Sequence, residues 1–197
     1  MNPKVKNIIR KIIYLVLFAL VIFCFIYLSD KYSSLSERKV MNFNDYYKDI
    51  NGNDIYTVVR ANQLITDLQK GKHLIFIGDS KSKWSIKYAE ELTKVFSLKK
   101  IDTVDYYDLA SDRNQMNSNY YEIMDLLESY LTTVDGNNNM LLAPSFYIII
   151  DGKVKYYNTD TVAMRNTISE NDYWTTEKQE EFLNEINTAI NKYYLNN

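Results

Sequence analysis

The sequence predicts an α/β domain with a mixed central sheet and helices on both faces, preceded by one N-terminal transmembrane helix. Three observations lead to this prediction. Short apolar runs alternate along the chain with stretches whose apolar residues recur at helical spacing. An Asp-Gly pair late in the chain joins two short runs, as in a β-hairpin. The N-terminal residues differ from the rest, because a basic leader precedes a long uncharged apolar run.

The N-terminal segment has the pattern of a signal anchor. Residues 1–11 carry four basic side chains, and residues 12–28 read IIYLVLFALVIFCFIYL, without a charge, Gly or Pro. At about 1.5 Å per residue this run covers roughly 26 Å, close to the ~30 Å hydrocarbon core of a bilayer. The basic leader predicts a cytoplasmic N-terminus, so the rest of the chain would be extracytoplasmic. We therefore expect a single-pass cell-membrane protein that contacts lipid through residues 12–28.

Two other interpretations of this segment stay open, a cleaved signal peptide and a lipoprotein signal. The stretch YLSDKYSS offers only a weak cleavage site. Phe23, directly before Cys24, does not suit lipoprotein processing. We expect the anchor at 12–29 to be retained, with residues 30–53 as a stalk and N-terminal extension and residues 54–197 as the folded domain.

Composition bears on several classes of function. The net charge is −2, which gives no indication of nucleic-acid binding. Cys24 is the only cysteine and lies in the apolar run, which excludes an intramolecular disulfide, a Cys-based metal site and a His-Cys catalytic pair. His73 is the only histidine, and we expect it to be an ordinary structural residue at the start of a strand. The stretch DGNNN at 135–139 predicts a turn, because the twelfth position of a calcium loop would be Phe146 rather than Glu. We expect neither a cofactor nor a metal.

The elements of the outer domain follow from their patterns in chain order. Strands are predicted where short apolar or β-branched runs occur, at 54–59 (DIYTVV), 73–77 (HLIFI), 103–109, 146–150 and 154–157. Helices are predicted where apolar residues recur every three or four positions, at 61–70, 83–97, 119–131 and 180–195. Gly71 suits the C-terminus of the first helix, and Asp151-Gly152 suits a hairpin turn. The early alternation predicts parallel strands joined by right-handed crossovers, and the late hairpin adds antiparallel strands.

This order of elements, together with two stretches, resembles the thioredoxin superfamily. FIGDSKSKWSIKYAEEL, at 76–92, is similar to the strand, glycine, turn and helix that carry the family's Cys-x-x-Cys motif. APSFYIIIDGKVKYY, at 143–157, resembles the second family signature, a proline before a strand and then a Gly-containing hairpin. The resemblance covers roughly residues 54–195. It implies a thioredoxin-like fold with a cis peptide bond at Ala143–Pro144.

The resemblance places the two motif cysteines at Ser82 and Ser85, with Lys83 and Trp84 between them. Thiol–disulfide exchange needs a thiolate, whereas a serine hydroxyl is far less acidic and cannot form a disulfide. We therefore expect no catalytic residue and no enzyme activity of the family's kind. Ser82 is expected to be a helix N-cap. A serine hydrolase is not expected, because His73 starts the strand about 16 Å before the turn.

In the family, the turn and the proline loop form a groove that holds an extended peptide. The resemblance therefore implies that Ser82, Lys83, Trp84 and Ser85 face a partner-binding groove completed by Ala143 and Pro144. We expect Trp84 to be exposed, since nothing in the local pattern requires its burial, and tryptophan is enriched where binding energy concentrates.

A membrane-anchored domain rich in Asn, Lys, Ile and Tyr is also similar to the bacteriocin transport accessory proteins of Gram-positive bacteria, which usually keep the cysteines. This resemblance implies a redox-inactive protein that binds a peptide or protein partner outside the cytoplasmic membrane, in bacteriocin production, export or immunity. Two alternatives stay open. One is a thiol-disulfide oxidoreductase whose native cysteines were replaced by serine, and the other is a structural ectodomain of a larger membrane complex.

Overall fold

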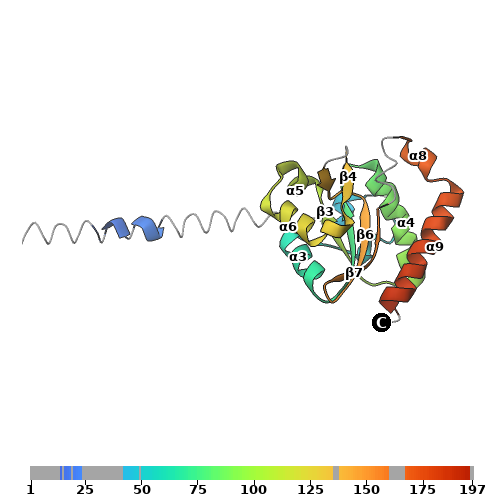
Figure 1. Ribbon diagram of the computed structural model, residues 1–197, viewed down its shortest axis with the longest axis horizontal. Helices are drawn as coiled ribbons and strands as arrows, with labels where there is room; N and C mark the ends of the chain where they lie inside the picture. Colours follow the sequence, from blue (N-terminus) through green and yellow to red (C-terminus); the bar gives the residue numbers. More distant parts are fainter. Residues whose placement is uncertain are drawn as a thin grey trace, which may run out of the picture. The chain divides into compact units, whose positions relative to one another are not determined.

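The computed structural model describes residues 14, 16–18, 20–23, 42–48, 50–134, 138–159 and 167–195 of the chain. The chain divides into two compact units, Met1–Val40 and Met41–Asn197. Most of the predicted anchor, the leader and the stalk lie outside the described residues. The described part of the first unit, shown in blue in Figure 1, is helical and exposed. Within the described ranges, no helix combines the length and apolar character that a membrane crossing requires.

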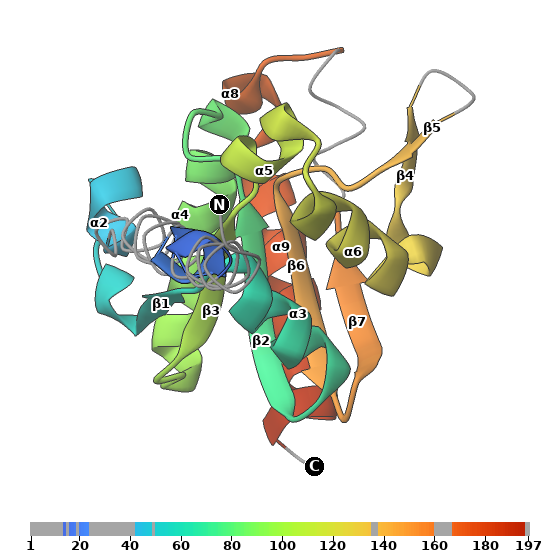
Figure 2. The ribbon, with the colours of Figure 1, turned by 90° about the vertical axis from the view of Figure 1, so that its left-hand side faces the viewer.

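The second unit is built on a five-stranded sheet in the order β1-β3-β2-β6-β7 (Figure 2). Its strands are β1 (Tyr56–Val58), β2 (Lys72–Gly78), β3 (Val104–Asp108), β6 (Ser145–Ile150) and β7 (Lys153–Asn158). β1, β3 and β2 run parallel, whereas β6 pairs antiparallel with β2 and β7 antiparallel with β6. The predicted mixed sheet is therefore confirmed. Both ends of each predicted strand lie within two residues of the corresponding ends of an observed strand.

Helices cover both faces of this sheet. Figure 2 shows α3 (Ala61–Gln69) and α6 (Ser118–Leu126) in front of the sheet and α9 (Thr176–Ile190) behind it. α4 (Lys83–Lys99) packs on the same face as α9. Successive side chains of a strand point to opposite faces. Phe76 of β2 therefore belongs to the core under α4 and α9, while Ile75 and Ile77 belong to the core under α3 and α6.

Short elements supplement the predicted ones. They are α2 (Phe43–Tyr46), η1 (Asn53–Ile55), α5 (Ala110–Gln115), η2 (Glu128–Tyr130), β4 (Thr132–Val134), β5 (Asn138–Met140), α8 (Glu170–Tyr173) and a π-helical turn, η3 (Asn191–Leu195). β4 and β5 form a separate two-stranded sheet where the sequence analysis expects a loop. The last helix begins at Thr176, earlier than predicted, because the Thr175 hydroxyl caps it by accepting the Lys178 N–H.

Residues 43–50, predicted to lie in the N-terminal extension, belong to the folded unit. Phe43, Tyr47 and Ile50 are buried in the core. Phe43 stacks on Tyr56 of β1, with 4.0 Å between ring centroids. The Tyr106 hydroxyl donates a hydrogen bond to the Tyr47 hydroxyl at 3.1 Å. The predicted domain start at residue 54 is therefore too late, since these contacts join residues far apart in the sequence and leave no local periodicity.

Gly78, the last residue of β2, is required by the same packing. A Cβ atom on Gly78 would lie 2.5 Å from the Tyr47 hydroxyl oxygen and 2.8 Å from the ring of Tyr106. Both aromatic rings are buried, so neither has space to move aside. The segment that begins the folded unit therefore contacts the point where β2 leaves the sheet.

Phe43→Ala is expected to lower the free energy of unfolding by about 3–5 kcal/mol, because it removes a buried ring that stacks on Tyr56. The exposed neighbour Asn44 provides the matched control, and Asn44→Ala should change stability by less than about 0.5 kcal/mol. Chemical denaturation followed by circular dichroism measures both. Equal stability of the two variants would contradict the assignment of α2 to the core.

Candidate functional site

The turn with the two serines and the proline loop lie at the same end of the sheet. Ile77 of β2 pairs with Ser145 of β6, so Gly78 and Pro144, the next residues outward, leave the sheet together. The Ala143–Pro144 peptide bond is cis, which confirms the prediction. The register of β2 and β6 therefore brings together two sequence signatures that are separated by more than fifty residues.

Asp79 holds the turn that follows β2. Its carboxylate accepts the backbone N–H of Lys81 at 3.0 Å, and its carbonyl accepts the N–H of Ser82 at 2.9 Å. Arg113, from α5, donates to the other carboxylate oxygen at 2.6 Å. An aspartate that bonds the backbone two residues onward stabilises a tight turn.

Asp108, at the end of β3, holds the same turn from a neighbouring strand. Its carboxylate accepts both the backbone N–H and the hydroxyl of Ser80, each at 3.1 Å. Because β3 pairs with β2 up to Gly78 and Asp108, the end of β3 supplies this anchor without any extra segment. The turn is thus fixed by its own Asp79, by Asp108 of β3 and by Arg113 of α5.

Ser82 and Ser85, the positions where the resemblance places the motif cysteines, have different environments. Ser82 occupies the N-cap position of α4, but among the described residues its side chain makes no capping hydrogen bond, contrary to the predicted cap. Ser85 is fully buried, and its hydroxyl oxygen accepts the backbone N–H of Asp79 at 3.0 Å. The Ser85 hydroxyl therefore closes the turn and does not face solvent.

Trp84 is buried, so the prediction that it is exposed is wrong. Its side chain is only 8 % exposed, and its ring centroid lies 5.4 Å from that of Tyr173 in α8. Lys83 Nζ lies 3.7 Å from the carboxylate of Glu170 in the same short helix. α8 therefore covers the start of α4. The local pattern around Trp84 cannot reveal this cover, because α8 comes much later in the chain.

The predicted groove residues Ala143 and Pro144 are buried as well. At this end of the sheet, Lys81 and Lys83 are exposed and Ser82 is half-buried. The predicted residues thus lie near one another, but Trp84, Ala143 and Pro144 are buried and do not form the exposed surface. The accessible side chains here are therefore those of the two lysines and, in part, Ser82.

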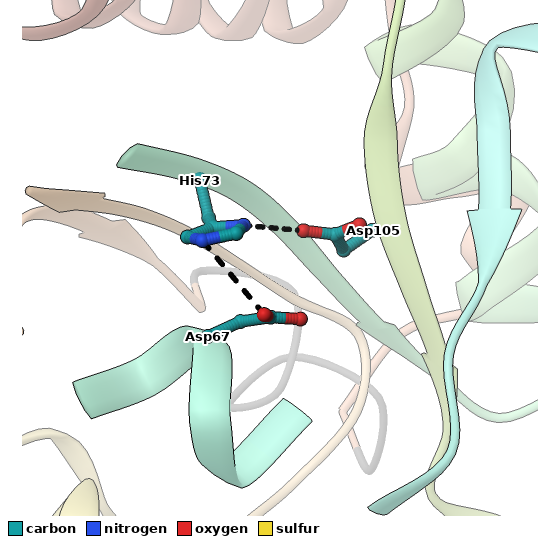
Figure 3. Close-up of side chains that lie close together, drawn as sticks. All are labelled: Asp67, His73 and Asp105. Atoms are coloured by element: carbon teal, nitrogen blue, oxygen red, sulfur yellow. Dashed lines mark hydrogen bonds and ion pairs between the residues drawn. The ribbon is translucent and has the colours of Figure 1, made fainter. Parts of the chain in front are cut away.

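A second polar cluster surrounds His73 at the opposite end of β2 (Figure 3). His73 Nδ1 lies 2.8 Å from Asp105 Oδ2 of β3, and its Nε2 lies 3.7 Å from Asp67 Oδ1 of α3. The side chains of His73 and Asp67 are 26 % and 4 % exposed. Burial raises the pKa of the Asp105 carboxyl, and its hydrogen bond with His73 opposes that rise. His73 lies in β2 as expected, and its ring links carboxylates from α3 and β3.

This cluster borders a cleft of about 560 Å³ between the end of β1 and α3. Arg60, Asn62 and Gln63 line the same cleft, and Gln63 donates its amide N–H to Asp67 Oδ1 at 2.6 Å. The sequence does carry one signal of the cluster. Asp67 lies between Leu64 and Leu68 on the apolar stripe of α3, where a carboxylate must be buried.

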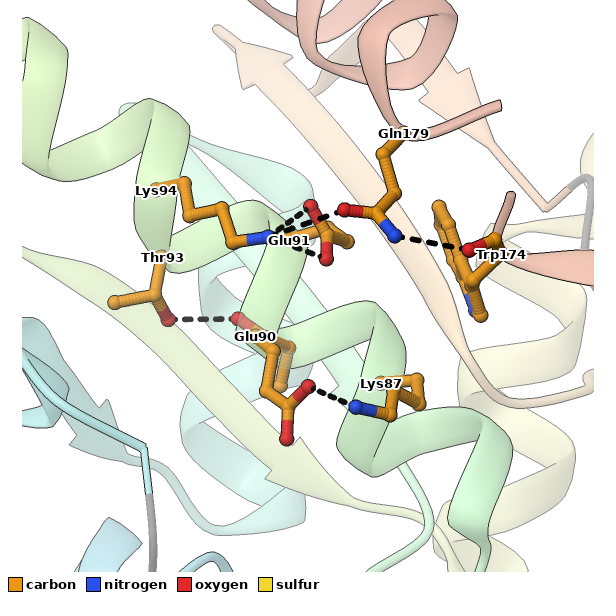
Figure 4. A network of polar contacts seen from close by, with 8 residues as sticks. Lys87, Glu90, Glu91, Thr93, Lys94, Trp174 and Gln179 are labelled. Carbon is orange, nitrogen blue, oxygen red and sulfur yellow. Dashed lines mark hydrogen bonds and ion pairs between the residues drawn. The ribbon is translucent and has the colours of Figure 1, made fainter. Parts of the chain in front are cut away.

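A third polar network joins α4 to α9 (Figure 4). Lys94 Nζ donates to the two carboxylate oxygens of Glu91 at 2.6 and 2.7 Å and contacts Gln179 at 3.5 Å. The Gln179 amide donates to the Trp174 carbonyl at 2.9 Å. Because these polar groups hydrogen-bond to one another, we assign this network to the packing of α9 against α4.

No protein-family model matches the chain, and no curated protein matches it. Function must therefore be inferred from the geometry of the serine turn and of the His73 cluster.

Ser85→Ala is expected to lower the free energy of unfolding by about 1–3 kcal/mol, because the backbone N–H of Asp79 loses its acceptor. Ser82→Ala, in the same turn, should cost less than about 0.5 kcal/mol, since its hydroxyl makes no capping bond in the described structure. Chemical denaturation compares the two variants. A larger loss of stability for Ser82→Ala than for Ser85→Ala would mean that the Ser82 hydroxyl, and not that of Ser85, stabilises the turn.

Proposed function

We propose that the chain is a membrane-anchored, thioredoxin-like protein without thiol–disulfide activity, which binds a peptide or protein partner outside the cytoplasmic membrane. The proposal rests on which residues occupy the turn and how they are bonded. Serines occupy both family cysteine positions, and Ser85 is buried and bonded to Asp79 within the turn. Exchange chemistry needs an accessible thiolate, so this turn has a structural and binding role only.

The order of elements supports the thioredoxin-like part of the proposal. Strand, helix, strand, helix, strand, helix and hairpin follow one another, and α9 ends the series. The cis bond before Pro144 is a feature that the resemblance to the family implies. α2, α8 and the β4–β5 hairpin are additions to that order. α8 accounts for the covered Trp84, and α2 accounts for the earlier start of the folded unit.

The rigidity of the turn supports a role in binding. Asp79, Asp108 and Arg113 fix its backbone although no reaction needs that precision. A preorganised surface loses less conformational entropy when it binds a partner. The exposed groups there, Lys81 and Lys83, favour a partner that presents carboxylates or backbone carbonyls.

Anchoring by residues 12–28 is part of the proposal and rests on the sequence pattern. The resemblance to bacteriocin transport accessory proteins makes a bacteriocin peptide, its exporter or its immunity protein the first partners to test. Binding at the turn also separates this proposal from a purely structural ectodomain, which would make its contacts elsewhere.

The purified full chain is expected to show no turnover in an insulin-reduction assay, because neither motif position carries a thiol. The double variant Ser82→Cys/Ser85→Cys should gain turnover if the scaffold keeps the family geometry. Ser82→Cys alone should not, since release of the mixed disulfide needs the second thiol. Turnover by the unmodified chain would refute a redox-inactive protein, whereas turnover by the double variant would support the thioredoxin-like geometry.

A photo-crosslinking residue in place of Lys83 is expected to capture one defined partner from membranes that express the full chain. Lys83 is 80 % exposed at the start of α4. Leu98, 78 % exposed near the end of the same helix, is the matched control position. Mass spectrometry identifies the captured species. Capture of the same partner from position 98, or from that position alone, would contradict binding at the turn.

A further inference from the structure

The His73 cluster has the arrangement of a metal site that uses imidazole and carboxylate donors. Donor atoms of Asp67, His73 and Asp105 all lie within 4.8 Å of one another. They come from α3, β2 and β3, three elements that the sheet and its helix hold in fixed positions. We propose that Asp67 and His73 bind a divalent transition-metal ion of the zinc class, and that Asp105 is a positioning residue for the imidazole.

The hydrogen bond to Asp105 determines which imidazole nitrogen is available. Nδ1 lies 2.8 Å from Asp105 Oδ2, so in the neutral ring Nδ1 carries the proton and donates it to the carboxylate. Nε2 then keeps its lone pair, and Asp67 Oδ1 lies 3.7 Å from this nitrogen (Figure 3). A histidine that ligates a metal commonly donates its other N–H to a carboxylate in this way.

The separation of Nε2 and Asp67 Oδ1 suits a shared ion. At 3.7 Å the two atoms are too far apart for a direct hydrogen bond. With metal–ligand distances of about 2.0–2.2 Å, this separation corresponds to a ligand–metal–ligand angle of about 125°, near the tetrahedral range. Gly71 leaves space beside the ring, since a Cβ atom there would lie 2.8 Å from Nε2.

Charge favours a divalent occupant. Among the residues that the structure describes, His73 is the one ion-pair partner of both Asp67 and Asp105. A protonated imidazole leaves the three groups with a net charge of −1, whereas a neutral imidazole with a divalent ion leaves no net charge. Asp67 is almost fully buried, and a buried carboxylate is costly without a compensating charge.

The remaining coordination positions face the cleft. Two protein ligands leave at least two positions of a tetrahedral ion for water or for a third donor. The Gln63 side chain already contacts Asp67 Oδ1 at 2.6 Å, so its amide oxygen lies within one side-chain rotation of the site. Imidazole nitrogen selects zinc-class ions over calcium and magnesium, which prefer ligand sets made only of oxygen.

The test uses Zn²⁺ and the full chain in detergent, with the imidazole of His73 observed by NMR. His73 is the only histidine, so its ring signals need no assignment. Nitrogen shifts of the zinc-free protein should show a proton on Nδ1. Added Zn²⁺ should shift the Nε2 signal saturably at a 1:1 ratio, and chelation by EDTA should reverse the shift. Cys24 does not confuse this measurement, because the signal arises from His73 itself.

Asp67→Asn and Asp105→Asn are the informative variants. Each should weaken Zn²⁺ binding about 10–100-fold, Asp67→Asn by loss of a ligand and Asp105→Asn by loss of the charged partner of the imidazole. Asp105→Asn should also change the populations of the two imidazole tautomers in the zinc-free protein, because Asp105 accepts the Nδ1 proton; the loss of Zn²⁺ affinity in the same variant is the result that a purely structural role would not predict. Asp102→Asn, an exposed aspartate before β3, is the control and should leave binding unchanged. Circular dichroism confirms that each variant is folded.

Two results would overturn the proposal. The first is a His73 signal that responds to pH but not to Zn²⁺ at concentrations up to the millimolar range, which indicates a simple ion pair between two carboxylates. The second is an Asp67→Asn variant that binds Zn²⁺ as tightly as the unmodified chain. Neither result bears on binding at the serine turn, because the two sites lie at opposite ends of β2.

Discussion

The pairing of β2 with both of its neighbours, β6 and β3, is the constraint on which the two sites depend. β2 is buried on both faces, with Leu74 and Phe76 in one core cluster and Ile75 and Ile77 in the other. Burial of each such side chain contributes about 1.5–3 kcal/mol, so the position of this strand is strongly determined. The antiparallel register then fixes both ends of the strand. One end brings Gly78 beside Pro144, and the other places His73 opposite Ile149, within reach of α3 and β3.

The charges around the turn agree with the proposal that the protein does not exchange thiols and disulfides. A reactive thiolate needs an electropositive surrounding, which a helix N-terminus and nearby basic groups provide. Here two carboxylates, Asp79 and Asp108, hold the turn at the start of α4, and Arg113 pairs with the first of them. Their negative charge disfavours an anion in this turn, although Arg113 offsets that of Asp79. The same carboxylates satisfy backbone N–H groups, so an electrostatic arrangement unsuited to exchange gives the turn its fixed shape.

The sequence predicts the sheet well because its strands are defined by local apolar runs, as HLIFI at 73–77 illustrates. The sequence does not predict the environment of a side chain when a segment far along the chain packs against it. Trp84 is buried by Tyr173, and Phe43 joins the core through Tyr56, yet neither contact leaves a local pattern. The sequence does not reveal the His73 cluster for the same reason, since its three members become adjacent only when β2 and β3 pair. A carboxylate on the apolar stripe of α3 was the one signal present in the sequence.

The early start of the folded unit also bears on the serine turn. Tyr47 lies within the predicted N-terminal extension and packs against Gly78, where β2 ends and the turn begins. A Cβ atom on Gly78 would lie 2.5 Å from the Tyr47 hydroxyl oxygen, so the residues at these two positions restrict each other. A substitution at position 47 or 78 would therefore disturb both the core and the start of the turn, which is why the extension predicted at 30–53 cannot be treated as a stalk alone.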